Sequence, residues 1–103
     1  MTKEFNSYRL YYQSAPQYSW QSRLYLYSGG AYVGSVFFMK EGESIPANIE
    51  ISGHPRLHFP SSKFEEIMNV FRHEKPLYIG LVPSNGIGTI STSSEPIGEE
   101  EED

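Results

Sequence analysis

A chain of 103 residues is long enough for one hydrophobic core but too short for two domains. It contains no cysteine, which excludes disulfides, thiolate metal sites and thiol nucleophiles, and on that ground we expect a cytoplasmic protein. No apolar run approaches the roughly 20 residues of a membrane-spanning helix, and the first four residues are not followed by the apolar core of a signal sequence.

The formal net charge of -5 is unevenly distributed along the chain. Six of the thirteen acidic residues lie between Glu95 and Asp103, whereas residues 1–94 carry eight basic and seven acidic side chains, a net charge of +1. After Thr92 the sequence offers too little apolar surface to offset the entropy cost of ordering. We therefore predict a single α+β domain over residues 1–92 and a disordered acidic tail over residues 93–103.

The first predicted strand covers residues 5–13, where two kinds of side chain alternate with the period of a β-strand. One set is Tyr8, Leu10 and Tyr12, and the other is Arg9, Tyr11 and Gln13. The segment 14–19, which contains Pro16, is predicted to be a loop.

Two adjacent glycines mark the clearest hairpin. Gly29 and Gly30 lie between predicted strands at residues 23–27 and 32–40, and they supply the positive φ angles of a tight turn. In this register Tyr27 faces Tyr32, and Leu26 faces Val33. The predicted core face of the hairpin contains Leu24, Leu26, Val33 and Phe37, with Met39 as a further candidate. The predicted amphipathic face contains Arg23, Tyr25, Tyr27, Tyr32 and Val36.

Turn signals indicate further β segments in the second half of the chain. After a surface connection over residues 41–48, residues 49–52 and 56–59 form either two short strands or one bent strand. Residues 77–82 and 87–91 are predicted to be a second hairpin, because Asn85-Gly86 between them is a frequent turn pair.

Residues 62–73 are predicted to be the single helix of the domain. Ser62 and Glu65 have the spacing of a capping box, in which each side chain accepts from a free backbone N–H of the first turn. The apolar residues recur at helical spacing: Phe64, Ile67, Met68 and Phe71. A short helix is stable only when such a stripe packs on another apolar surface.

These elements predict an α+β fold, a curved antiparallel β-sheet built from hairpins and packed against one amphipathic helix at about residues 62–73. The predicted sheet core consists of Leu10, Leu24, Leu26, Val33, Phe37, Ile79 and Leu81, facing the apolar stripe of the helix.

No catalytic or metal-binding motif is present in the sequence. His54 and His58 lie four residues apart, but in an extended segment they are separated by roughly 13 Å and cannot share one ion. The only aspartate is Asp103, so a Ser-His-Asp triad is not indicated. We therefore expect a non-enzymatic protein without cofactor or metal.

Aromatic residues are the most informative excess in the composition, at 15% of the chain. Four tyrosines and two arginines are predicted to share one sheet face: Arg9, Tyr11, Arg23, Tyr25, Tyr27 and Tyr32. Such a face suits single-stranded nucleic acid, because bases stack on rings while cations contact phosphates. It also suits a homodimer interface, because tyrosine is frequent both in strands and at interfaces. The acidic tail is either a solubilising extension or a tethered polyanion that screens a cationic groove.

The order of strands, one amphipathic helix and further strands resembles the fold of the single-stranded-DNA-binding transcriptional regulators, the positive cofactor four and Whirly proteins. Three stretches, "VGSVFFMKEGE" (residues 33–43), "LHFPSSKFEEIMNVFRHEKPLYIGL" (residues 57–81) and "GTISTSSEPIGEEE" (residues 88–101), are also similar to a small uncharacterised bacterial family assigned to that fold. The resemblance implies a helix-backed curved sheet, a dimer or higher oligomer, and a strand surface open to unpaired DNA. This chain departs from the DNA-binding members because it lacks a lysine-rich segment. The resemblance assigns no binding residue, since no family motif for DNA contact aligns with this sequence.

The sequence thus predicts a binding module that acts as a homodimer on single-stranded DNA or RNA or in transcriptional regulation. The alternative prediction is a protein–protein interaction or homo-oligomerisation domain without a nucleic-acid ligand.

Overall fold

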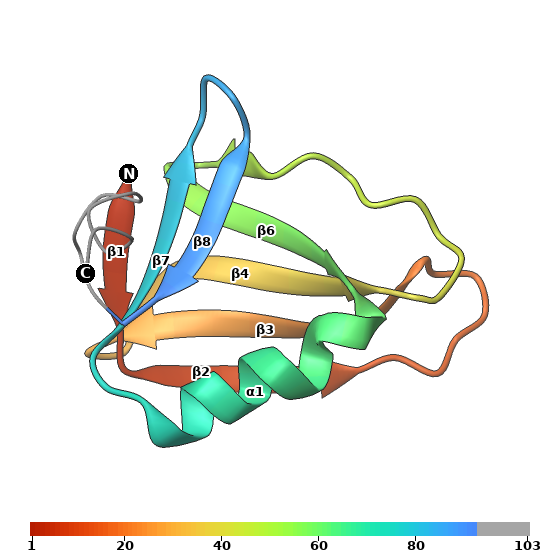
Figure 1. Cartoon of the computed structure of the whole chain (residues 1–103), viewed down its shortest axis with the longest axis horizontal. Coiled ribbons are helices and arrows are strands. Elements are labelled where there is room, and N and C mark those ends of the chain that lie inside the picture. The colour runs from red at the N-terminus through yellow and green to blue at the C-terminus, as the bar shows by residue number, and fades with distance from the viewer. Residues whose placement is uncertain (93–103) are drawn as a thin grey trace, which may run out of the picture.

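The computed structural model describes residues 1–92, which form an α+β fold with two open sheets and one helical segment (Figure 1). The five-stranded sheet has the order β2-β3-β4-β6-β5, and the three-stranded sheet has the order β1-β7-β8. The strands are β1 (Thr2–Phe5), β2 (Ser7–Tyr12), β3 (Trp20–Ser28), β4 (Ala31–Met39), β5 (Ile49–Ile51), β6 (His54–Pro60), β7 (Leu77–Val82) and β8 (Ile87–Ser91). The predicted disordered tail, residues 93–103, lies outside the described residues.

The α+β class, the two hairpins and the position of the helix are confirmed. Two details differ from the predicted antiparallel sheet. Strands β4 and β6 pair in parallel, because the connection over residues 40–53 is long enough to return the chain to the start of β4. The predicted strand over residues 5–13 is divided at Asn6, so that β1 pairs with β7 while β2 pairs with β3.

The β3-β4 hairpin contains a bulge that reverses part of the predicted pattern. Tyr27 faces Tyr32 as predicted, but Leu26 pairs with Gly34 rather than Val33. The extra residue shifts β4 by one position, and a one-residue shift moves every following side chain to the other face. Val36 therefore joins the core and is fully buried, whereas Phe37 lies on the opposite face. The predicted faces of Val36 and Phe37 were wrong for this reason.

The core lies between the five-stranded sheet and the elements that cover one of its faces. Its buried cluster consists of Phe5, Leu24, Leu26, Val36, Phe38, Leu57, Met68, Phe71, Leu77, Ile79 and Leu81. Val33, Phe64 and Ile67 pack against this cluster, as predicted. Leu10 does not belong to it. Leu10 is 37% exposed because β2 is an edge strand of the sheet, and its predicted core position was wrong.

The helical segment begins with a 3-10 turn, η1 (Ser61–Lys63), and continues as α1 (Phe64–His73). No side chain caps either start, so the predicted capping box of Ser62 and Glu65 is absent. The 3-10 turn takes the place of a cap, because its tighter backbone hydrogen bonds use N–H groups that a bare helix end leaves free.

Helix α1 packs its apolar stripe on strands of both sheets through aromatic contacts. The Phe71 ring lies 5.0 Å from that of Phe5 and 5.4 Å from that of Tyr8. The Phe64 ring lies 5.1 Å from that of Phe38 and 5.4 Å from that of Tyr12. Within residues 1–92, no helix is long and apolar enough to cross a membrane.

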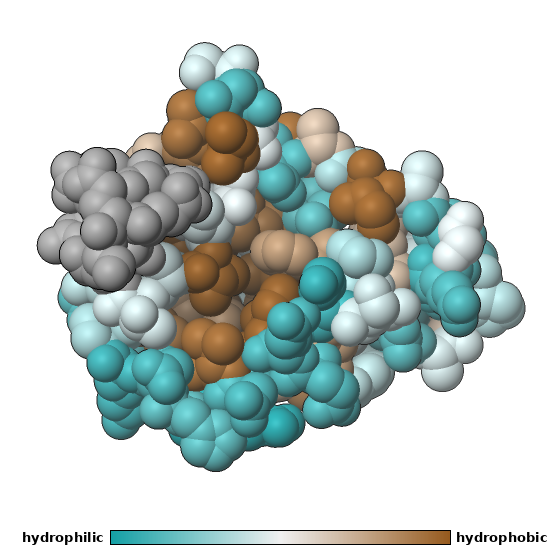
Figure 2. Space-filling view, viewed as in Figure 1, coloured by the Kyte–Doolittle hydropathy of each residue, from teal (hydrophilic) through white to brown (hydrophobic). Residues whose placement is uncertain are grey.

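The helix and the three-stranded sheet cover the same side of the five-stranded sheet (Figure 1). Apolar atoms gather on this side in the region between α1 and the β7-β8 hairpin (Figure 2). Among the described residues, no helix or second sheet covers the other side. We call that side the open face.

Candidate binding face

The open face receives side chains from β2, β3, β4 and β6, because paired residues of neighbouring strands point to the same side of a sheet. The strand register places these residues on it: Arg9, Tyr11, Arg23, Tyr25, Tyr27, Tyr32, Ser35, Phe37, His54, Arg56 and His58. Trp20 joins them through its contacts with Arg23 and Phe37.

Arg23 is the centre of this face. Its guanidinium carbon lies 4.7 Å from the ring centre of Trp20, 4.9 Å from that of Tyr25 and 5.2 Å from that of Tyr11. The Nε atom of Arg23 is buried and has no hydrogen-bond partner within the described residues. Three rings therefore hold the cation in place, while its Nε donor has no partner within residues 1–92.

Two further arginines lie over rings on either side of Arg23. The Arg9 guanidinium carbon is 5.4 Å from the ring centre of Tyr27, and that of Arg56 is 4.8 Å from the ring centre of Phe37. Arg56 also donates a hydrogen bond from Nε to the Ser35 hydroxyl at 3.3 Å. Each arginine of the face is thus positioned by an aromatic ring.

A row of rings crosses four strands of the open face. Neighbouring ring centres are 5.5 Å apart for Tyr11 and Tyr25, 5.9 Å for Tyr25 and Tyr32, and 5.0 Å for Tyr32 and His54. All three pairs meet edge to face, the arrangement that aromatic quadrupoles favour. Tyr11 and Tyr32 remain 39% and 36% exposed, so the row is accessible to a planar partner.

The open face is positively charged and carries no carboxylate from its own strands. Glu50 is the single acidic residue in the five strands of this sheet. It pairs with the buried Pro55 and therefore points to the opposite side. The one ion pair among the described residues joins Lys63 and Glu66, outside the open face. The charges of the three arginines are consequently not neutralised by neighbouring acids.

His58 lies beside Phe37, with ring centres 5.8 Å apart. Burial lowers the pKa of His58 below its ordinary value of 6.5, and the neighbouring charge of Arg56 lowers this pKa further. Its Nδ1 is buried without a hydrogen-bond partner among residues 1–92. The second histidine of the strand, His54, accepts a 3.0 Å hydrogen bond at Nδ1 from the ammonium group of Lys3.

All six residues that the sequence placed on one sheet face are brought together: Arg9, Tyr11, Arg23, Tyr25, Tyr27 and Tyr32. Sequence reasoning missed Trp20, Phe37 and Arg56. Phe37 was assigned to the core because the bulge was not foreseen, and Arg56 became part of the face through the parallel pairing of β4 and β6. The signal available for Arg56 was the alternation of His54, Arg56 and His58 with apolar residues along one strand, which is typical of a strand with one polar face.

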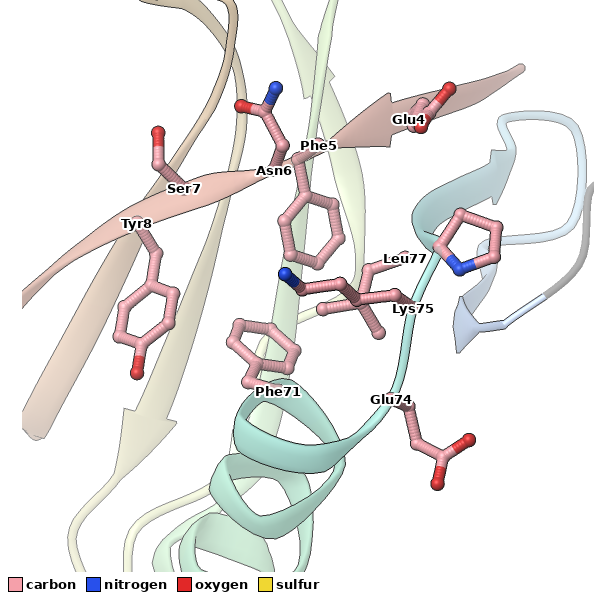
Figure 3. A pocket seen from close by; sticks show the side chains of 10 residues that line it. Glu4, Phe5, Asn6, Ser7, Tyr8, Phe71, Glu74, Lys75 and Leu77 are labelled. Atoms are coloured by element: carbon pink, nitrogen blue, oxygen red, sulfur yellow. The ribbon is translucent and has the colours of Figure 1, made fainter.

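A cavity of about 320 Å³ lies where β1 leads into β2, beside the C-terminal end of α1. Figure 3 shows the rings of Phe5, Tyr8 and Phe71 directed toward it, whereas the carboxylates of Glu4 and Glu74 point away. Its volume is near the lower limit for small-molecule pockets. The lining is mostly apolar, and the side chain of Lys75 extends toward the rings of Phe5 and Phe71 (Figure 3).

Residues 1–92 contain no group of three or more histidine, cysteine, aspartate or glutamate side chains able to hold a metal ion. Comparisons of the chain with protein-family models, with curated proteins and with solved structures found no match.

Proposed function

We propose that this chain is a cytoplasmic, non-enzymatic module that binds single-stranded nucleic acid on the open face of its five-stranded sheet. One observation supports this above the others. Three guanidinium groups lie over aromatic rings on a face whose own strands supply no carboxylate. Bases stack on such rings and phosphates pair with such cations, so both parts of a nucleotide find a partner.

The arrangement favours an unpaired strand over a duplex. Arg9, Arg23 and Arg56 lie on β2, β3 and β6, so they are spread over three strand spacings, or about 14 Å. A single strand that crosses the sheet passes each cation and exposes its bases to the ring row. A duplex keeps the faces of its bases stacked internally, so it offers phosphates, sugars and base edges but no free base face to the rings. The resemblance to the single-stranded-DNA-binding transcriptional regulators leads to the same proposal and suggests a regulatory role.

The proposal is tested by fluorescence anisotropy with labelled single-stranded DNA and RNA and with a duplex, at about 0.05 M and about 0.2 M salt. Both the full chain and a form ending at Thr92 are measured. We expect single strands to bind more tightly than the duplex. Contacts of three phosphates predict a slope of about -2 for the logarithm of affinity against the logarithm of salt concentration. Absence of binding by both forms at the lower salt would overturn the proposal.

Substitutions distinguish the contacts of arginines with phosphates from the stacking of bases on tyrosine rings. Arg9→Gln or Arg56→Gln is expected to reduce the magnitude of the salt slope by about 0.7 each. The matched control is Arg72→Gln, because Arg72 is exposed on the helix and away from the open face.

Tyr32→Leu is expected to weaken binding by about 1–3 kcal/mol, the value of one stacked base. Its control is Tyr12→Leu, since Tyr12 is 61% exposed and contacts Phe64 of the helix.

A second candidate function is homodimerisation or protein binding without a nucleic-acid ligand. The outer edge of β5 supports it, because β5 is at the end of the sheet order and carries two exposed apolar residues. Ile49 and Ile51 are 43% and 38% exposed. Pairing of two β5 edges would join two open faces into one surface. Sedimentation velocity tests this candidate, and Ile51→Lys is expected to dissociate a dimer formed through this edge. A monomer at all concentrations would eliminate homodimerisation through this edge.

A further inference from the structure

We infer that the acidic segment, residues 93–103, docks on the open face of its own chain and occupies the site proposed for nucleic acid. The regulatory consequence, competition with a nucleic-acid strand, rests on the proposed function. The docking itself depends only on charge, reach and accessibility.

Charge complementarity is the first argument. The open face carries Arg9, Arg23 and Arg56, and none of them has a carboxylate partner within residues 1–92. Six of the thirteen acidic residues of the chain lie between positions 95 and 103, and five of them are consecutive, from Glu99 to Asp103. The densest negative charge and the face with the unpaired cations are therefore on the same molecule. Carboxylates pair well with guanidinium groups that rings have already positioned.

Geometry is the second argument, since β8 lies two strands from β1, which leads at Asn6 into β2, the edge strand of the five-stranded sheet, so that a segment following β8 reaches the open face around this edge. Ser91 pairs with Tyr78 of β7, which in turn pairs with Glu4 of β1. Two residues further along the chain, the Asn6 amide donates to the Tyr27 carbonyl at 2.9 Å. Two strand spacings and two residues of extended chain give a path of roughly 16 Å from the end of β8 to Tyr27.

Residues 93–103 are long enough to cover that path and to cross the face. Eleven extended residues span up to about 36 Å. Arg9 lies against Tyr27, and Arg23 lies four residues further along β3, or about 13 Å. The acidic run therefore reaches both cations from its attachment at Thr92. A tether of this length also gives an effective concentration in the millimolar range, which favours the chain's own segment over that of a second molecule.

The chain's lack of cysteine allows a direct test of docking without any nucleic acid. A nitroxide is attached to the full chain at Gly98→Cys, a substitution that keeps all six acidic residues, and amide signals are recorded by NMR. At low salt, we expect strong line broadening at Arg9, Tyr27 and Tyr32. The amides of Glu66 and Arg72 on the helix serve as internal controls. Broadening should decrease at about 1 M salt, where charges are screened within about 3 Å.

Several results would overturn the inference. One is equal broadening of the open face and the helix at low salt. Another is broadening that persists in a variant in which the six acidic residues are replaced by Gln and Asn. Mixing spin-labelled protein with unlabelled, isotope-enriched protein detects docking on a second copy. If broadening of the open face comes only from that mixture, the segment acts between molecules and the inference is wrong.

A second measurement connects docking to the proposed function. Ending the chain at Thr92 is expected to raise affinity for single-stranded DNA about fivefold or more at low salt, the lower end of typical coupling between sites. If docking is observed but neither form binds nucleic acid, the proposed function fails and the docking inference stands. If both forms bind with equal affinity and the open face shows no broadening, the docking inference fails and the proposed function stands.

Discussion

Phe71 connects the helix to two strands, so its side chain should carry a large share of the packing energy. It is 6% exposed and its ring contacts those of Phe5 and Tyr8. We expect Phe71→Ala to lower the free energy of unfolding by about 3–5 kcal/mol, because it removes transfer energy and leaves a cavity. Urea denaturation measures this change. The neighbouring Arg72→Ala should change stability by less than about 0.5 kcal/mol, and a cost below about 1 kcal/mol at Phe71 would contradict the packing described here.

His58 should make stability dependent on pH. Its pKa in the folded state lies below 6.5 because of burial and the nearby charge of Arg56. Between pH 6.5 and that lower pKa, the unfolded chain binds a proton at this position and the folded chain does not. The free energy of unfolding therefore falls as the pH is lowered through this window.

Urea denaturation above and below pH 6.5 tests the role of His58 when it is performed on the native sequence and on His58→Gln. The native protein should lose more stability on acidification than the variant does. Parallel losses in the two proteins, or an NMR titration that places the pKa of His58 at or above 6.5, would contradict the assignment.

Among the elements, the β3-β4 hairpin depends on a close approach at its bulge. A Cβ atom on Gly34 would lie 3.0 Å from the Pro55 carbonyl oxygen and 3.3 Å from the end of the Ile79 side chain. We expect Gly34→Ala to destabilise the protein by about 1–3 kcal/mol through overpacking. Gly29→Asn is the matched control, since φ is 58° there, nothing lies within 4 Å, and Asn suits this turn. Equal stability of the two variants in thermal unfolding would count against the bulge.

At the start of the helix we expect a substitution to leave stability almost unchanged. A capping serine typically contributes about 1 kcal/mol, but no side-chain cap is made here. Ser62→Ala is therefore expected to change the free energy of unfolding by less than about 0.5 kcal/mol. A loss of about 1 kcal/mol or more in chemical denaturation would show that the hydroxyl does cap the helix.

The elements differ in how well they could be predicted from the sequence. Gly29-Gly30 and Asn85-Gly86 fixed both hairpin turns locally, and the apolar stripe fixed the helix, because each signal lies within a few residues. The bulge after Tyr32 and the parallel pairing of β4 with β6 depend on contacts between distant segments. For this reason the tyrosines of the open face could be predicted, whereas Phe37 and Arg56 could not.

At the scale of the whole molecule, the five-stranded sheet separates two different environments. One face meets the helix and the three-stranded sheet and forms the core. The other carries three ring-supported arginines with no acidic residue from its own strands. The central proposal is that this second face binds a single strand of nucleic acid.

The most direct measurement is an NMR titration of the form ending at Thr92 with a single-stranded oligonucleotide. We predict that amide shift changes will concentrate at Arg9, Arg23, Tyr25 and Arg56, together with the one indole N–H signal of Trp20. Shift changes confined to α1 or to the cavity beside Phe5, or no changes at low salt, would contradict the proposal.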